Sequence, residues 1–121
     1  MIRTKNIDTN DLVLAGAVTV DSGQVMLGDP CYLDEWQSKY DNFDEHKNKK
    51  GEYSYLGACN ATLGEEGYGE LGTGAAVVVS SGYGDGYYPV YVKLNEDNRI
   101  SMAFIDFDNV IDVTKDDEDE E

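Results

Sequence analysis

The sequence predicts a mainly β fold: a single-domain antiparallel β-sandwich or curled sheet with one short amphipathic helix. Apolar runs of strand length alternate with turns that are rich in glycine or polar residues. One segment shows the spacing of three and four residues that is typical of an amphipathic helix. The length of 121 residues suits one domain with an ordinary core. We assign this domain to residues 1–114.

The first two strands are expected at residues 12–20 and 24–27. Both runs are apolar, and the turn Asp21-Ser22-Gly23 separates them. A short glycine turn between two apolar runs is typical of a β-hairpin. We therefore expect these two strands to pair with each other.

The single helix is expected at residues 34–42, with Pro30 just ahead of its start. The apolar side chains at helical spacing are Leu33, Trp36, Tyr40 and Phe43. Their aromatic face should cover a sheet. The mostly charged residues 44–52 are expected to form an exposed loop.

The second half of the chain is expected to be β-structure. Residues 53–63 are rich in aromatic and β-compatible side chains and are predicted to form a strand, followed by a glycine-rich loop at residues 64–74. Three further strands are then predicted at residues 75–80, 87–94 and 99–107. Their short connections predict an antiparallel meander. Pro89 cannot donate to a sheet and should lie at a strand start or an edge.

The formal net charge is −16, of which the tail at residues 115–121 carries six negative charges and one positive, leaving −11 on the rest of the chain. Adjacent carboxylates repel each other and bury nothing, so the acidic tail is expected to be disordered. Direct nucleic-acid binding is not expected, because it depends on Lys and Arg, and the basic cluster is limited to residues 46–50. The acidity either attracts the basic surface of another protein or only keeps the chain soluble.

Cys31 and Cys59 are the only cysteines, and we expect both to be reduced. We prefer to read Cys31 as a small buried apolar residue rather than as a nucleophile. We expect no cofactor and no metal. Three Cys and His residues without paired spacing do not suit structural zinc, and the segment from Asp106 lacks the glycine and glutamate of a calcium-binding loop. No signal peptide and no membrane span is expected, so we predict a cytoplasmic protein.

Two loop segments form the best candidate site. The first is GDPCY at residues 28–32 and the second is GYGDGYYP at residues 82–89. Each combines turn residues with a carboxylate and an aromatic or thiol side chain at the end of an apolar strand. The expected ligand-binding residues are Asp29, Cys31, Tyr32, Trp36, Tyr83, Gly84, Asp85, Gly86 and Tyr87. The glycine loop can present N–H groups to an anion, and neighbouring tyrosines can stack on a planar ring.

These two motifs also carry a family resemblance. The run SGQVMLGDPCY at residues 22–32, followed by GYGDGYYPVY at residues 82–91, resembles an uncharacterised family of small β-rich proteins from bacteria and their phages. The resemblance covers most of residues 11–112. It implies a single β-rich domain and a bacterial or phage origin, which would place a phage-encoded chain in the host cell cytoplasm. It brings no catalytic residue.

The function that we predict is a non-enzymatic binding protein, a phage-type accessory factor that acts through its acidic surface or through the loops around Asp29 and Asp85. Its partner would be a host protein with a basic surface, or a small ligand. Two alternatives stay open. One is a protein that sequesters a nucleotide-like signal, and the other is a hydrolase that uses paired carboxylates or Cys31, with His46 as the base. The sequence does not predict the oligomeric state.

Overall fold

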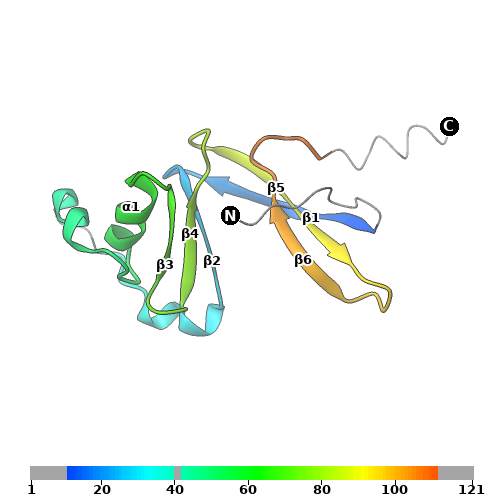
Figure 1. Cartoon of the computed structure of the whole chain (residues 1–121), viewed down its shortest axis with the longest axis horizontal. Helices are drawn as coiled ribbons and strands as arrows, with labels where there is room; N and C mark the ends of the chain where they lie inside the picture. The colour runs from blue at the N-terminus through cyan, green and yellow to red at the C-terminus, as the bar shows by residue number, and fades with distance from the viewer. Residues whose placement is uncertain (1–10, 40–41, 112–121) are drawn as a thin grey trace. The chain divides into compact units, whose positions relative to one another are not determined.

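The computed structural model describes residues 11–39 and 42–111. It divides into two compact units, unit 1 (Met1–Thr19 and Tyr87–Glu121) and unit 2 (Val20–Gly86), each of which we describe by itself. Each unit holds an open three-stranded sheet (Figure 1). The mainly β fold class is therefore confirmed. The boundary predicted at residue 114 and the acidic tail lie outside the described residues.

The sheet of unit 1 has the strand order β1-β5-β6, formed by β1 (Leu12–Val20), β5 (Gly86–Leu94) and β6 (Ile100–Ile105). β5 and β6 pair antiparallel, with Val90 opposite Ile105, which confirms the last two strands of the predicted meander. Asn95 forms the turn between them, because its side-chain oxygen accepts hydrogen bonds from the N–H groups of Asp97 and Arg99.

Pro89 lies inside β5, the middle strand of this sheet, so its predicted place at a strand start or an edge is wrong. The pairing with β6 begins one residue later, at Val90. The carbonyl of Pro89 still accepts a hydrogen bond from the N–H of Asp106 at 3.1 Å. A proline is tolerated here because it stands at the end of the pairing with β6.

Asp106 anchors the segment that follows β6. Its side chain is buried, and its carboxylate accepts hydrogen bonds from three backbone N–H groups, those of Asp108, Val110 and Ile111, at 3.2, 3.2 and 2.7 Å. The hydroxyl of Tyr91 donates to the carbonyl of Ile111 at 3.4 Å. These bonds fold the chain after β6 back onto its own sheet.

The sheet of unit 2 has the strand order β2-β4-β3, formed by β2 (Gln24–Gly28), β4 (Ala76–Ser80) and β3 (Tyr68–Leu71). Both pairings are antiparallel. The predicted hairpin is therefore wrong, because β1 neighbours β5 while β2 neighbours β4. The meander is wrong at its first connection, because β4 and β5 belong to different sheets. β3 also lies inside the segment that was predicted to be a glycine-rich loop.

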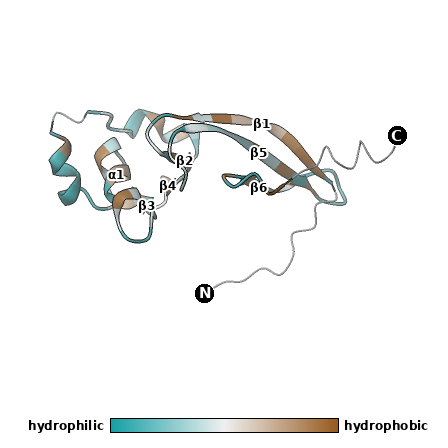
Figure 2. Ribbon diagram, turned by 90° about the horizontal axis from the view of Figure 1, so that it is seen from above, coloured by the Kyte–Doolittle hydropathy of each residue, from teal (hydrophilic) through white to brown (hydrophobic). Residues whose placement is uncertain are grey.

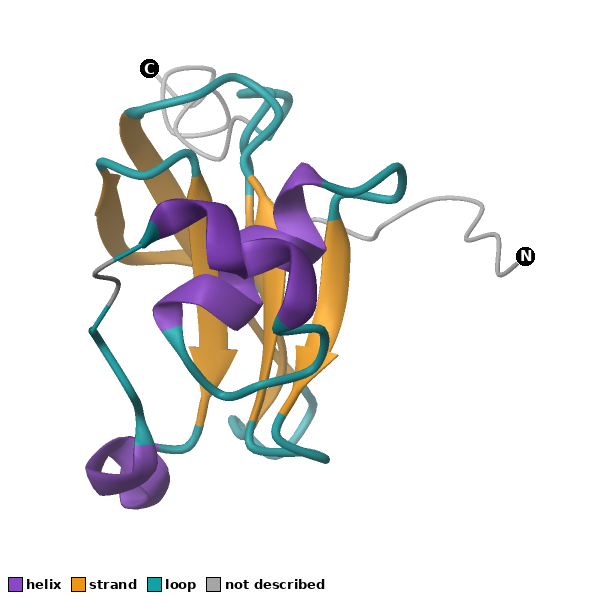
Figure 3. Cartoon of the chain, turned by 90° about the vertical axis from the view of Figure 1, so that its left-hand side faces the viewer, coloured by secondary structure: helices purple, strands orange, loops and turns teal. Residues whose placement is uncertain are grey.

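The helix α1 (Tyr55–Leu63) occupies the segment that was predicted to be a strand. Ser54 starts it as the N-cap, since its hydroxyl accepts a hydrogen bond from the N–H of Gly57 at 2.9 Å and donates one to the Glu52 carboxylate at 2.6 Å. Capping and burial of small residues override the strand preference of the tyrosines. The helix lies over one face of the β2-β4-β3 sheet (Figure 3).

The core of unit 2 fills the space between this helix and the sheet. Its buried members are Tyr53, Ala58, Leu71, Ala76 and Val78, with Met26, Trp36, Ala61 and Ala75 packed against them. Small side chains dominate the cluster, so the helix and the strands approach closely. A Cβ at Gly69 of β3 would lie only 3.0 Å from the Cβ of Ala61 on α1.

The amphipathic helix predicted at residues 34–42 is wrong. The 3₁₀-helix η1 (Pro30–Glu35) includes its first two residues and the 3₁₀-helix η2 (Phe43–Asn48) follows it, while residues 36–39 are not helical and residues 40–41 lie outside the described parts. One aromatic contact of the prediction is present, because the rings of Trp36 and Tyr53 meet edge to face at 5.2 Å. η2 also replaces part of the loop expected at residues 44–52. Among the described helices, none has the length and apolar character that crossing a bilayer requires.

Candidate functional site

The Asp29-to-Tyr32 motif forms the start of η1. The Asp29 carboxylate accepts a hydrogen bond from the N–H of Cys31 at 2.9 Å, and its carbonyl accepts one from the N–H of Tyr32 at 3.0 Å. Pro30 stands at the first helical position, where no N–H is needed. Cys31 is exposed, so the prediction of a buried thiol is wrong. The reason is that Cys31 lies in a 3₁₀-turn at the surface and not at the end of a strand.

The second motif forms a tight turn after β4. The buried Ser81 donates its hydroxyl hydrogen to the carbonyl of Gly84 at 2.6 Å, and Gly82 and Gly84 have positive φ values of 80° and 82°. The N–H of Ser81 also donates to the carbonyl of Gly23 at 2.9 Å. The glycines are therefore explained by the turn itself. Three of the predicted ligand residues lie in or next to this turn and are exposed: Tyr83, Gly84 and Asp85. Gly86 begins β5, and Tyr87, which belongs to unit 1, is 76% exposed.

The two motifs follow opposite ends of the β2–β4 pair. Gly28, which leads into Asp29, is opposite Ala76, whereas Ser80, which leads into the glycine turn, is opposite Gln24. Four residue steps along a strand separate these levels by about 13 Å. Figure 1 shows η1 at one end of the sheet and the turn after β4 at the other. Within unit 2 the motifs do not meet, so Asp29 and Asp85 do not form a carboxylate pair.

The predicted Cys31–His46 pair gains no geometric support. The ring of His46 belongs to η2, where Nδ1 lies 2.9 Å from the carbonyl oxygen of Phe43 and the ring stacks on the Phe43 ring at 4.7 Å. These local contacts hold the imidazole to its own turn. Of the predicted ligand residues, Trp36 lines a small cavity of about 140 Å³, together with Met26, Tyr55 and other residues of unit 2.

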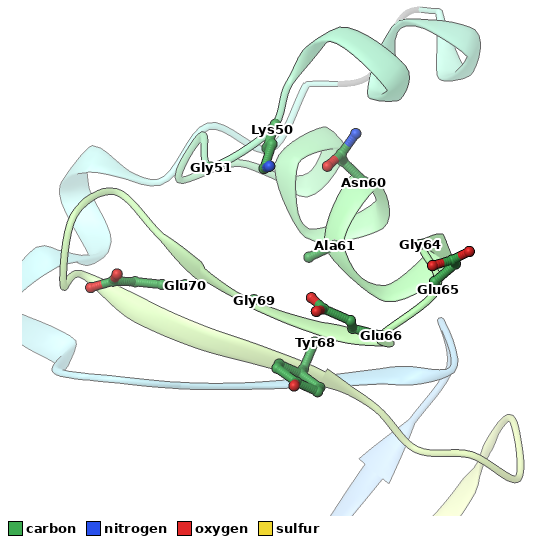
Figure 4. Close-up of a pocket in the computed structure, with 10 residues that line it drawn as sticks. All are labelled: Lys50, Gly51, Asn60, Ala61, Gly64, Glu65, Glu66, Tyr68, Gly69 and Glu70. Atoms are coloured by element: carbon green, nitrogen blue, oxygen red, sulfur yellow. The ribbon is translucent and has the colours of Figure 1, made fainter. Parts of the chain in front are cut away.

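A larger hollow of about 520 Å³ lies between α1 and β3 (Figure 4). Its lining residues come from the segment before α1, from α1 itself, from the connection to β3 and from β3: Lys50, Gly51, Asn60, Ala61, Gly64, Glu65, Glu66, Tyr68, Gly69 and Glu70. The two walls approach closely at Gly69 of β3 and Ala61 of α1. The frame is therefore fixed by backbone elements and by small side chains.

The lining of this hollow is acidic. Three acidic residues, Glu65, Glu66 and Glu70, and one cationic residue, Lys50, line it. In Figure 4 the carboxylates are spread along β3 and its preceding loop and do not converge on one point. In the described parts of the chain, no group of three or more His, Cys, Asp or Glu residues is arranged to hold a metal ion. The hollow therefore suits an extended cationic group, such as a Lys or Arg side chain, better than a single ion.

Asn60 joins the hollow to η2. Its side-chain amide donates to the carbonyl of His46 at 2.9 Å and lies 3.4 Å from that of Lys47, so α1 and η2 are fastened at this wall. The sequence does not predict this hollow, because the composition of residues 53–63 predicts a strand and not the helix that forms one wall. The sequence feature that could have indicated the hollow is a pair of adjacent acids, Glu65 and Glu66, inside a glycine-rich segment.

Comparison with known proteins gives one family. Neither the curated proteins nor the solved structures provide a significant match to the chain. The sequence profile of DUF4241, described as "Protein of unknown function", matches residues 5–105. This range includes both motifs and confirms the resemblance to an uncharacterised family, whereas the bacterial or phage origin stays a prediction. The chain therefore belongs to the DUF4241 family.

Proposed function

We propose that this chain is a non-enzymatic binding protein that recognises a basic segment of a partner protein through the hollow between α1 and β3. The observation that carries the proposal is the hollow itself, of about 520 Å³ and lined by three glutamates and one lysine. A Lys or Arg side chain can place its charge near these carboxylates while its aliphatic stem lies along Ala61.

The charge of the whole chain supports the same partner class. A net charge of −16 attracts a basic protein over long distances and repels the phosphates of nucleic acids. The other partner class in the sequence-based prediction, a small ligand held by both motif loops, has less support because unit 2 holds those loops apart. The further parts of the proposal, a phage-type accessory role in the cytoplasm of a host cell, rest on the sequence motifs and the charge.

A labelled hexalysine peptide tests the hollow directly. Its binding would be followed by fluorescence anisotropy at low and high salt, about 50 and 500 mM, because surface charge interactions weaken as salt screens them. In the double variant Glu65→Gln/Glu66→Gln we expect the affinity to fall about tenfold, which corresponds to roughly 0.7 kcal/mol for each removed charge.

The matched control is Glu96→Gln/Asp97→Asn, which removes the same charge from the exposed turn between β5 and β6. This control should bind hexalysine nearly as well as the unmodified chain. An equal loss in both double variants would show that the peptide responds to net charge alone, and the hollow would then not be the site.

A further inference from the structure

The strand β1 forms an outer edge of the unit 1 sheet. The order is β1-β5-β6, and among the described residues no strand pairs with β1 on the side away from β5. Figure 2 shows β1 as the outer strand, with brown, apolar colour over much of its length. An unpaired edge exposes a row of N–H and C=O groups that can pair with another chain.

The side chains of β1 leave this edge open. Val13 and Leu14 are 45% and 52% exposed, and adjacent residues of a strand point to opposite faces, so both faces of β1 are uncovered. A Cβ at Gly16 would meet no atom within 4 Å. β1 contains no charged residue and no proline, the residues that would discourage pairing at an edge.

The register identifies the residues that face outward. The carbonyl of Asp11 accepts a hydrogen bond from the N–H of Leu94 in β5 at 2.9 Å. Because successive residues of a regular strand direct their backbone groups to alternate sides, the even-numbered residues of β1 direct theirs away from β5. Leu14, Gly16 and Val18 therefore present the central donors and acceptors of the free edge.

We propose that β1 accepts an extended apolar segment of a partner protein as an added strand, and that Lys or Arg residues flank this segment. Asp11 and Asp21 are the residues immediately before and after β1, so a negative charge stands next to each end of the strand. A second copy pairing antiparallel around Gly16 would place Asp11 against Asp21 at both ends, and like charges repel there. The inference rests on the proposed function only in taking the partner to be basic.

The test uses two synthetic peptides, KKTVTVTVKK and its acidic counterpart EETVTVTVEE. Binding is measured by fluorescence anisotropy, and the site is located by amide hydrogen exchange at Leu14, Gly16 and Val18. We expect the lysine-flanked peptide to bind and to protect these amides, and the glutamate-flanked peptide to do neither. Gly16→Pro removes one outward N–H and should weaken binding about tenfold, because a hydrogen-bond partner is lost. Gly16→Ala keeps that N–H and the net charge, and it should bind like the unmodified chain.

A second pair of variants covers the case in which Gly16→Pro does not fold. Gly16→Lys places a charge on the edge, and Val110→Lys makes the same charge change at an exposed position outside the sheet. Only Gly16→Lys should lose the lysine-flanked peptide. Equal binding to all four variants, or protection confined to residues 64–70, would overturn the inference. A dimer in native mass spectrometry that protects the same amides without peptide would also overturn it, because the occupant would then be a second copy.

The two proposals fail separately. Hexalysine has no β-branched residues and reports on the hollow, whereas protection of β1 by KKTVTVTVKK reports on the edge. If hexalysine loses its selectivity but KKTVTVTVKK still protects β1, the proposal for the hollow is wrong and the proposal for the β1 edge stands. If hexalysine keeps its selectivity but β1 is not protected, the proposal for the edge is wrong and the proposal for the hollow stands.

Discussion

Gly57 of α1 lies directly against the backbone carbonyl of Glu52, so that any Cβ at position 57 would overlap the carbonyl oxygen. Gly57 is also buried, in the first turn of the helix that covers the unit 2 sheet. Glycine is therefore required at this position by close packing, although its φ is an ordinary one.

Replacing Gly57 with alanine should destabilise the protein, in contrast to the usual effect of that change within a helix. The obstacle is backbone and not a flexible side chain, so we expect the cost of the added methyl group at the upper end of about 1–3 kcal/mol. This cost exceeds the gain in helix propensity of about 1 kcal/mol. Urea unfolding measures the difference. Gly64→Ala at the other end of α1 is the matched control, because its Cβ would make only ordinary contacts at 3.4 Å or more. A stabilised Gly57→Ala variant would contradict the packing described here.

Ser54→Ala should lower the free energy of unfolding by about 1–2 kcal/mol, because it removes the cap of α1. The variant leaves the Gly57 N–H without its acceptor and the Glu52 carboxylate without its hydroxyl donor. Glu52→Gln serves as the control, since its amide oxygen can still accept from Ser54. If both variants unfold at the same urea concentration as the original chain, the cap contributes nothing.

Asp106→Ala should release the segment after β6. Three backbone N–H groups lose their charged acceptor, and a hydrogen bond to a charged group contributes about 1.5–3 kcal/mol. Amide exchange at Val110 and Ile111 should accelerate, while the amides of β4 in unit 2 should exchange at their original rates. Glu96→Ala, which also removes one negative charge, should leave all of these rates unchanged. Slow exchange at residues 110–111 in Asp106→Ala would disprove the anchoring role.

The two thiols should react at very different rates. Cys31 is exposed on η1, whereas Cys59 is buried in α1 and lies 3.7 Å from the side-chain nitrogen of Gln24. A maleimide should therefore add once to the folded chain, and a second time only after denaturation. Intact-mass spectrometry counts the additions, and Cys31→Ser should abolish the fast one. Two fast additions would show that α1 opens readily.

The pairing of β5 with β6 could be predicted from the sequence because the signals are local. A short polar turn around Asn95 joins two apolar runs, and the turn geometry fixes which strand follows which. The turn at Gly23 gives an equally strong local signal, yet β1 and β2 do not pair. Such a turn determines a change of direction, whereas the choice of partner depends on contacts far apart in the sequence, here with β5 and β4.

The helix α1 and the hollow could not be predicted for a related reason. The four buried residues of α1, Leu56–Cys59, are consecutive and not spaced by three or four, so no apolar stripe marks the helix. The hollow depends on the packing of α1 beside β3, which approach closely at Ala61 and Gly69. Asp29 and Pro30, a cap and a first-turn residue, mark the start of η1, but the aromatic spacing after them placed the predicted helix too late in the chain, at residues 34–42.

The hydrogen bond between the Ser81 N–H and the Gly23 carbonyl joins the beginning and the end of unit 2. Unit 2 is one continuous stretch of sequence, and this bond brings its entry and its exit to the same place. Unit 1 is discontinuous, with one part before that stretch and the other after it. This is the anatomy of an inserted module, whose neighbouring ends allow excision or transplantation without distorting the host. Residues 20–86 are thus the natural fragment to express alone, or to graft into a surface loop of another scaffold.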